Sequence, residues 1–366
     1  MKLILDKDVF LEKLSLASKF TTTKLSTTTT LQGVLLNNKD GELEMSSTNL
    51  NAYFHTKIKT QEKQKAEILV EPKKIIEFLS FLSPGKVALT AEEKKLTITK
   101  EKTQGTFSIW EAKDFPAPPA LQGEKEQAIK TDFLTKNLPF ILFSASPDET
   151  RPTLTGVNFI SQDEELTMVS TDGFRLSLVK TKNSHRLSSM LVPSDFLNEV
   201  LRFLKEEKEF GLTASDKEKT ILFRVGGSEF YSRLIDGDFP PYEKVVPTDK
   251  KTTVVVDREE FLKNVKVISV FARDFSNIVL CEFKKDGIYL TPKVDGEEKS
   301  SAYQEAEVDG EEQKVAFNFK FLIDFLGHTG SKKVIVEVLR PDAPVVFKLE
   351  GNKEFLHIIM PVRIQS

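Results

Sequence analysis

The sequence TLTGVNFISQDEELTMVSTDGFRL, residues 153–176, decides the fold. Its two runs of alternating apolar residues, joined by the polar segment 161–164, predict a β-hairpin. An earlier stretch repeats this hairpin. TLQGVLL begins at Thr30 and its counterpart at Thr153, whereas ELEMSST begins at Glu42 and its counterpart at Glu165. Both pairs are 123 residues apart, since 153 − 30 = 123 and 165 − 42 = 123. A repeat of fixed period therefore organises the chain.

Apolar residues at helical spacing recur around these hairpins and predict six helices. Capping residues or a proline mark the start of five of them. They are Phe10, Leu11 and Leu14 after Asp6; Ile75, Ile76, Leu79 and Leu82 after Pro72; Phe133, Leu134, Leu138 and Ile141; Phe196 to Leu204 after Pro193; Phe261, Leu262 and Val265 after Asp257; and Phe321 to Leu326 after Asn318. The first and fifth sets match at an offset of 251.

Short strands lie between these helices, and the last is expected over 355–364. A proline-rich linker is expected at 114–119, and its opening motif Asp-Phe-Pro recurs at 238–240. Each block reads as helix, strands, helix, strands, so the chain is predicted to be an α+β protein. Three tandem domains follow, at 1–120, 121–250 and 251–366.

Composition limits the classes of function. The 52 Lys and Arg are balanced by 55 Asp and Glu, so overall charge does not indicate nucleic-acid binding, although the charges could be segregated on different faces. No apolar run is long enough to cross a membrane, and Asp6 interrupts any signal peptide. A single cysteine, Cys281, fits a reducing compartment, so a cytoplasmic location is expected. The four histidines are scattered, so neither a metal nor another cofactor is expected.

Three motifs stand out beside the triple repeat: STDGFRL at 170–176, DGDFPPY at 236–242 and IIMPVRI at 358–364. With them the chain closely resembles the bacterial DNA polymerase III β subunit, the replicative sliding clamp. The resemblance implies three clamp domains, each with two helices backed by antiparallel sheets. It also implies a head-to-tail homodimer that closes into a ring around double-stranded DNA, without sequence specificity. The implied function is that of a non-catalytic processivity factor.

The resemblance further implies a hydrophobic pocket for short partner peptides. Its expected partners are the replicative polymerase α subunit, the clamp loader and other proteins with a clamp-binding motif. The positions carried over are Leu154, Thr171, Gly173, Phe174, Arg175, Leu176, Pro240, Lys244, Val245, Ile358, Ile359, Met360, Pro361, Val362, Arg363 and Ile364. Phe174 stands where the family often has His and Lys244 where it often has Arg, while Gln365 and Ser366 extend past the usual aliphatic end.

Cations on the polar helix faces are expected to line the hole and to contact phosphates. By themselves such residues describe ordinary solvated helix faces. With the resemblance, the expected DNA-binding residues are Lys24, Lys73, Arg151, Thr153, Arg202, Lys205, Lys263 and Lys266. The ring joint is expected to bring Phe107 and Ile109 of one chain against Val270 and Phe271 of the next.

Two alternatives remain at the level of sequence. One is a metal-dependent phosphoesterase that uses Asp172, Asp236 and Asp238, although no neighbouring His supports a carboxylate pair and tight turns explain both Asp-Gly pairs. The other is a three-domain binding scaffold that forms no ring. A stable monomer would favour the scaffold, whereas magnesium-dependent hydrolysis lost in Asp172→Ala would favour the enzyme.

Overall fold

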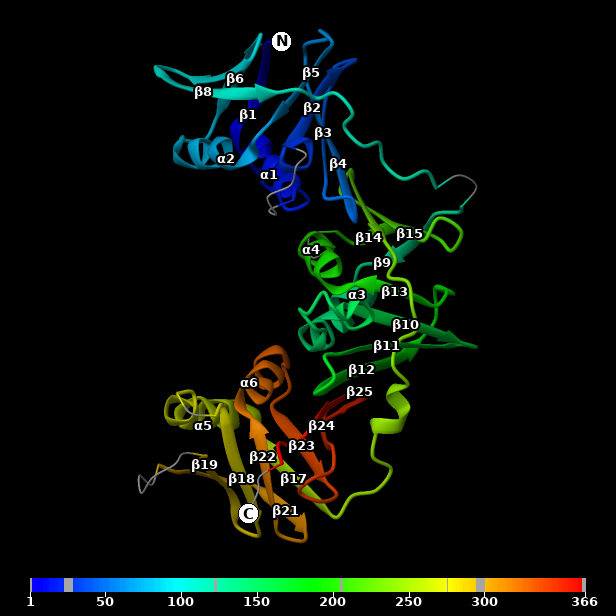
Figure 1. The fold of residues 1–366 in the computed structure, drawn as a ribbon, viewed down its shortest axis with the longest axis vertical. Helices are drawn as coiled ribbons and strands as arrows, with labels where there is room; N and C mark the ends of the chain where they lie inside the picture. Colours follow the sequence, from blue (N-terminus) through cyan, green and yellow to red (C-terminus); the bar gives the residue numbers. More distant parts are fainter. Residues whose placement is uncertain are drawn as a thin grey trace. The chain divides into compact units, whose positions relative to one another are not determined.

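The computed structural model describes residues 2–22, 29–121, 124–204, 207–274, 276–293 and 300–363 of the 366-residue chain. The chain divides into two compact units. The first contains Met1–Thr131 and Arg202–Leu234, and the second contains Asp132–Leu201 and Ile235–Ser366. Helices pack against antiparallel sheets in both units, which confirms the predicted α+β class (Figure 1). None of the described helices is long and apolar enough to span a membrane.

The first unit is built on one twelve-stranded sheet, in the order β1-β6-β7-β8-β5-β2-β3-β4-β16-β15-β14-β9. Its strands are β1 (Lys2–Asp6), β2 (Val34–Lys39), β3 (Glu42–Thr48), β4 (Ala52–Lys59), β5 (Ala66–Val70), β6 (Lys86–Glu92), β7 (Lys95–Lys100), β8 (Thr103–Trp110), β9 (Gln127–Lys130), β14 (Glu209–Ser215), β15 (Thr220–Val225) and β16 (Ser228–Arg233). The helices α1 (Lys7–Ser18) and α2 (Pro72–Phe81) pack against each other, and both contact this sheet. Helix α4 (Ser194–Leu204) runs from the residues of the second unit into those of the first.

The second unit contains a nine-stranded sheet, β13-β10-β11-β12-β25-β24-β23-β17-β21, and a four-stranded sheet, β20-β19-β18-β22. Its strands are β10 (Gly156–Gln162), β11 (Glu165–Thr171), β12 (Arg175–Lys182), β13 (Met190–Pro193), β17 (Thr252–Asp257), β18 (Ile278–Lys284), β19 (Gly287–Pro292), β20 (Ala302–Glu305), β21 (Glu307–Gly310), β22 (Gln313–Asn318), β23 (Lys333–Val338), β24 (Val345–Leu349) and β25 (Asn352–Ile359). Its helices are α3 (Asp132–Asn137), α5 (Arg258–Ala272) and α6 (Phe319–His328), of which α5 and α6 pack together.

The repeat seen in the sequence is reproduced in the strand register. Lys39 lies opposite Glu42 in the first hairpin and Gln162 opposite Glu165 in the second, 123 residues later. The next strand follows the same rule, because Thr48 pairs with Tyr53 and Thr171 with Leu176. A register shift of one residue would turn every side chain to the other face, so this agreement preserves the inner and outer faces in both repeats. Both predicted hairpins are confirmed.

Each large sheet continues from one repeat into the next. In the first unit β4 pairs with β16, and we call this pairing the first joint. In the second unit β12 pairs with β25, which we call the second joint. The two compact units therefore each hold strands from two repeats, and the domain boundaries expected near residues 120 and 250 remain a prediction.

Three of the predicted helix starts are confirmed by hydrogen bonds. Asp6 Oδ1 accepts from the amides of Asp8 and Val9, at 3.0 and 3.1 Å. The side chains of Asp257 and Asn318 cap α5 and α6 in the same way. Such a cap satisfies an amide that the helix itself leaves unpaired, and contributes about 1 kcal/mol.

Two sequence predictions were wrong. The helix expected over 133–141 stops at Asn137, and single 3-10 turns replace its second half. Pro139 explains this, because it lacks the N–H that a helix needs and its ring would strike the preceding turn. The strand expected over 355–364 ends at Ile359. Pro361 follows shortly after and cannot donate to a ladder.

Candidate functional site

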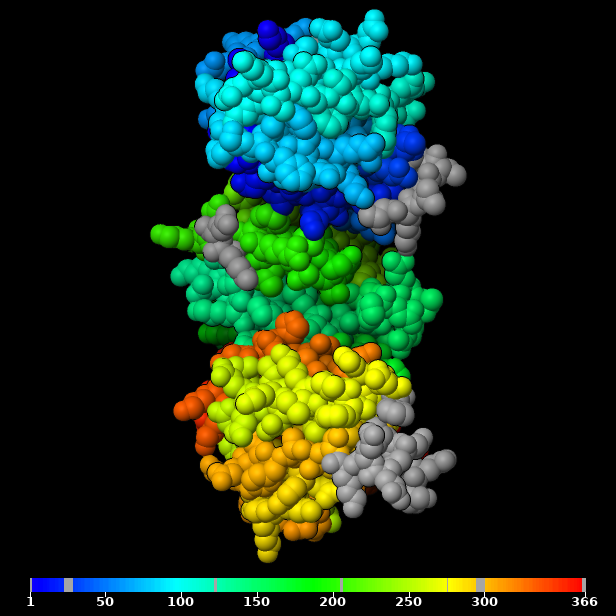
Figure 2. Space-filling model, turned by 90° about the vertical axis from the view of Figure 1, so that its left-hand side faces the viewer, coloured from blue at the N-terminus to red at the C-terminus, as the bar shows by residue number. Residues whose placement is uncertain are grey.

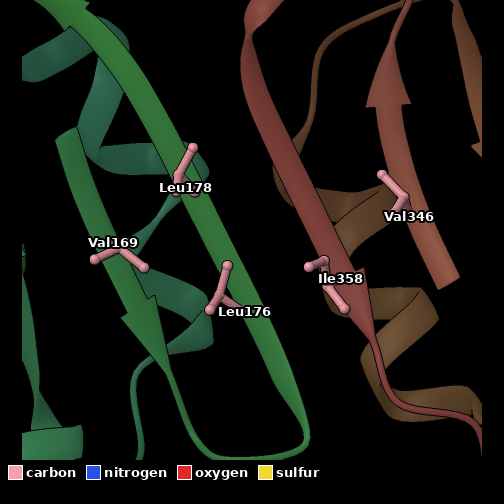
Figure 3. Packing of buried hydrophobic residues seen from close by; sticks show 5 residues of the cluster. All are labelled: Val169, Leu176, Leu178, Val346 and Ile358. Atoms are coloured by element: carbon pink, nitrogen blue, oxygen red, sulfur yellow. The ribbon is translucent and has the colours of Figure 1, made fainter. Parts of the chain in front are cut away.

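An apolar cluster lies on one face of the second joint. Its buried members, which we call the joint cluster, are Val169, Leu176, Leu178, Val346 and Ile358. They come from four neighbouring strands, β11, β12, β25 and β24, as Figure 3 shows. Half-buried apolar residues pack around the cluster: Ile160, Phe239, Tyr242, Val246 and Leu356. Phe239 is part of the second Asp-Phe-Pro motif, and Tyr242 and Val246 follow it, so segments far apart in the sequence meet here.

The turn from Thr171 to Arg175, which we call the Asp172 turn, borders this cluster. Asp172 Oδ1 accepts from the amides of Phe174 and Arg175, at 2.8 and 3.0 Å. Gly173 has φ +94°, a left-handed conformation in which the Cβ of any other residue would be strained. The turn is thereby fixed by its own side chain, and it presents Phe174 with 59% of its surface exposed.

Arg175 points inward and braces the turn. Its Nε donates to Asp172 Oδ2 at 3.0 Å, and its Nη1 donates to Asp324 Oδ2 at 2.6 Å. The guanidinium also lies over the rings of Phe143 and Phe321, at 5.8 and 4.8 Å from their centroids. With 10% of its side chain exposed, Arg175 ties β12 to α6.

The other expected pocket residues lie around the cluster in three groups. Leu154 is buried in a 3-10 turn ahead of β10. Pro240, Lys244 and Val245 are exposed in the segment that packs against one side of the cluster. The C-terminal group is held to the Asp172 turn, since the Met360 amide donates to the Phe174 carbonyl at 2.8 Å. Of that group, Ile359, Met360, Pro361, Val362 and Arg363 lie within the described residues, and Ile364 lies outside them.

Ile358 and Ile359 face opposite sides of the sheet, because successive strand residues alternate. Ile358 belongs to the joint cluster, whereas Ile359 is buried outside it. The structure therefore brings Leu176 and Ile358 together at the cluster and leaves Ile359 as core.

A buried histidine lies beside the second joint. His357 Nδ1 shares a 2.8 Å hydrogen bond with Ser177, and its ring stacks on Phe325 with the centroids 4.8 Å apart. Burial, together with the positive charge of Arg175, holds the pKa of His357 well below its usual range. The ring is therefore a neutral part of the core. No pattern in the sequence distinguished His357 from the other histidines.

The first joint carries the matching positions but fills them differently. Tyr53 lies opposite Tyr231 there, just as Leu176 lies opposite Ile358 at the second joint. Both tyrosines are buried with Leu222, and Phe115 and Leu121 pack over them. Burial and the hydrogen bond to Glu229 raise the pKa of Tyr231. The first joint thus has two large phenol rings at the positions where the second joint has the smaller side chains of Leu176 and Ile358.

The carboxylates of the rival enzyme hypothesis do not form a metal centre. Asp172 is occupied by the amides of its own turn and by Arg175. Within the described residues no group of three or more His, Cys, Asp or Glu side chains could hold a metal ion.

The expected DNA-binding cations lie on exposed surface wherever the structure describes them. Lys73 is on α2, Arg202 on α4, and Lys263 and Lys266 on α5. Arg151 and Thr153 lie in the loop ahead of β10. Lys24 and Lys205 fall outside the described residues.

The expected ring-joint residues lie among further exposed apolar side chains. Phe107 and Ile109 are half-buried on β8, while Val270 and Phe271 are exposed on α5. Figure 2 shows α2 (light blue) at the surface of the first unit, and it shows α5 (yellow-green) at the surface of the second. Sequence reasoning missed three exposed side chains: Phe81 at the end of α2, 82% exposed, Val267 on α5 and Tyr303 on β20. A search for apolar residues on the polar side of each predicted helix could have found the first two.

Known families match all three repeats. The models of the N-terminal, central and C-terminal domains of the DNA polymerase III beta subunit match residues 1–119, 128–241 and 243–363. The beta sliding clamp of Treponema pallidum is 27% identical over 374 residues and covers 100% of both chains. That of Bacillus subtilis is 25% identical, over 99% of this chain and 100% of its own.

Solved structures agree with this match. The DNA polymerase III beta subunit of Thermotoga maritima is 25% identical and superimposes with a TM-score of 0.91, covering 100% of both chains. A sliding clamp from Pseudomonas aeruginosa, solved bound to griselimycin, has the same fold at 22% identity, with a TM-score of 0.88 over 100% of both chains.

Proposed function

Because the chain belongs to the DNA polymerase III beta subunit family, the bacterial sliding clamps, we propose that it holds partner proteins on duplex DNA through the joint cluster. The chain is a processivity clamp built of three tandem clamp domains and not a catalytic subunit. The observation that carries this is the match of all three domain models along one chain. DNA and a DNA polymerase are its partners. The polymerase α subunit as the contact, the clamp loader as a further partner and a cytoplasmic location belong to the proposal.

Retention on DNA tests the clamp directly. A closed ring leaves linear DNA by sliding off an end but cannot leave a circle without opening. We expect the protein, once loaded, to stay on nicked circular DNA and to be lost when a single cut linearises it. Equal loss from both would contradict topological binding. Blocking both ends of the linear DNA should restore retention, which provides the control.

The peptide site is proposed at the joint cluster and the Asp172 turn. Buried aliphatic side chains form its floor, and the exposed Phe174 and Val245 form its rim. Apolar pockets of this kind, with a few polar groups around them, bind short segments through hydrophobic anchors. Met360 adds a flexible side chain that adapts to varied anchors. Apart from Ile359, which is core on the opposite face of the sheet, the remaining site residues named above are proposed as its walls.

Removal of the C-terminal segment tests this site. Deleting residues 360–366 should abolish binding of a labelled peptide with leucine and phenylalanine anchors, because the deletion removes one wall. Sedimentation should still give the dimer. As a matched control, Leu50→Ala changes the equivalent turn of the first repeat and should leave peptide binding unchanged. Undiminished peptide affinity in the deletion variant would place the site elsewhere.

The dimer joint is proposed by extension of the repeat. The first joint pairs β4 with the last strand of the second repeat, and the second joint pairs β12 with the last strand of the third. The corresponding pair is then β20 with β8, the last strand of the first repeat, from a second copy. Among the described residues β20 pairs only with β19, and the segment 103–107 of β8 pairs only with β7. Unpaired edges beside exposed Phe81, Val270 and Phe271 are what such a joint would cover.

A charge placed in this joint tests it. Phe271→Asp should yield a folded monomer by sedimentation, because a carboxylate would be buried unpaired at the interface. Val9→Asp, at another exposed apolar residue on a helix, is the control and should stay dimeric. A dimer in both variants would contradict this interface.

The DNA contacts are proposed to be weak and independent of sequence. Lys73, Arg202, Lys263 and Lys266 extend from helix faces, and Arg151 with Thr153 from a loop, so they meet phosphates and not base edges. Lys24 and Lys205 belong to the same proposal. Changing Lys263 and Lys266 together to Gln should weaken binding to a short duplex and reduce its salt dependence by about two counterions.

A further inference from the structure

The loop that carries Arg151 touches both proposed sites. Arg151 Nε donates to Asp148 Oδ2 at 2.9 Å, within the loop. Arg151 Nη1 donates to the Asp172 carbonyl at 3.2 Å, in the turn that borders the joint cluster. A residue expected to meet DNA therefore contacts the backbone that shapes the peptide site.

The Asp172 turn passes this contact on to the rim of the peptide site. Asp172 fixes the amides of Phe174 and Arg175 with one carboxylate oxygen. The Phe174 carbonyl accepts a hydrogen bond from the Met360 amide, so the C-terminal segment is bonded to the same turn. Holding the Asp172 carbonyl thus restrains the rim side chain and the neighbouring wall together.

The other end of the loop reaches the second flank of the cluster. Leu154 is buried next to Thr153, and a Cβ added to Gly237 would lie 3.0 Å from Thr153 Cγ2. Gly237 precedes the segment that carries Pro240 and Val245. The loop is therefore packed against both sides of the proposed pocket.

Arg151 can hold the turn and a phosphate at once. A guanidinium has five N–H donors, and the two hydrogen bonds described above use two of them. The side chain is 45% exposed, so its remaining donors are open to a ligand from solvent. Thr150 and Arg151 hold the pKa of Asp148 below its usual range, so this exposed carboxylate stays charged and holds the guanidinium by an ion pair.

We propose that Arg151 is a positioning residue that couples the two sites, so that duplex DNA on the ring tightens peptide binding. A phosphate on the open donors would fix the guanidinium, and with it the Asp172 turn. A partner peptide would then meet a rim that is already ordered and lose less conformational entropy on binding. This inference rests on the peptide site and the DNA contacts proposed above.

Linkage between the two ligands tests the coupling. We would measure the affinity of the dimer for a labelled peptide with leucine and phenylalanine anchors, without duplex and with a saturating short duplex. The wild type should bind the peptide about fivefold more tightly with duplex, and by reciprocity the peptide should tighten duplex binding by the same factor. Arg151→Lys keeps the charge but loses the forked N–H donors of the guanidinium. This variant should still bind both ligands, but its peptide affinity should be nearly the same with and without duplex.

A matched variant separates coupling from plain loss of DNA affinity. Lys263→Gln removes a proposed phosphate contact on α5, away from the loop, and should need more duplex to saturate yet keep the fivefold ratio. A ratio of one in the wild type, or an unchanged ratio in Arg151→Lys, would overturn the coupling. Failure of the peptide to bind the free dimer at all would instead overturn the peptide site on which it rests.

Discussion

At the scale of single residues, His357 makes stability depend on pH. Its pKa is lowered in the folded chain, whereas an unfolded chain has the ordinary value of 6.5. Below that pH the unfolded state binds a proton that the folded state refuses, so stability falls as the pH decreases. The loss approaches about 1.4 kcal/mol per pH unit, until the pH reaches the folded-state pKa.

Chemical denaturation at several pH values measures this effect. Between pH 7.5 and pH 5.5, conditions that bracket the ordinary histidine pKa of about 6.5, the urea midpoint of the wild type should fall more than that of His357→Gln. The control His185→Gln should follow the wild type. Parallel curves for the wild type and His357→Gln would contradict the assignment.

Leu50 shows strain at a single position. It has φ +74°, in the left-handed region, and is 53% exposed at the tip between β3 and β4. Its counterpart 123 residues later is Gly173, which adopts a similar φ without a Cβ. Such a conformation costs a leucine roughly 1–2 kcal/mol, and asparagine tolerates it better.

We therefore expect Leu50→Asn to raise the free energy of unfolding by about 1 kcal/mol. Leu50→Val should lower it, because a branched Cβ crowds this region further. Thermal unfolding of the three proteins measures the order. A destabilised Leu50→Asn variant would show that the side chain contributes contacts that outweigh the strain.

At the scale of elements, the cap of α5 matters because this helix carries proposed DNA and dimer residues. Asp257 Oδ1 accepts from the Glu260 amide at 3.0 Å. Asp257→Ala should destabilise the protein by about 1 kcal/mol, and Asp257→Asn by less because it keeps the acceptor. Urea unfolding compares the two, and equal losses would mean that the charge and not the hydrogen bond matters.

The elements also show how far sequence alone leads. The hairpins and caps were predictable because alternation, turn residues and capping side chains act within a few residues. The helix over 133–141 was not, because Pro139 interrupts an apolar spacing that is otherwise helical. The two joints were missed because β4 with β16 and β12 with β25 pair across long stretches of chain and leave no local pattern. The inward placement of Arg175 likewise depends on Asp324, which is distant in sequence.

At the scale of the whole molecule, a net charge of −3 favours retention by topology over retention by attraction. Binding of the dimer to a short linear duplex should weaken steeply from about 0.05 to 0.2 M salt, because the cations displace counterions. Retention on a circle should change far less over the same range. Gel filtration of loaded circles measures this, and an equally steep loss from circles would show that charge, not closure, holds the protein.

The tyrosines of the first joint limit how many partner proteins one ring can bind through the proposed peptide site. Tyr53 and Tyr231 fill the positions that are aliphatic at the second joint, so the peptide site proposed above occurs once per chain. By the same proposal, a dimer has two such sites and not four. When a polymerase occupies one site, one site remains free on the ring. Other partner enzymes must then compete for that second site.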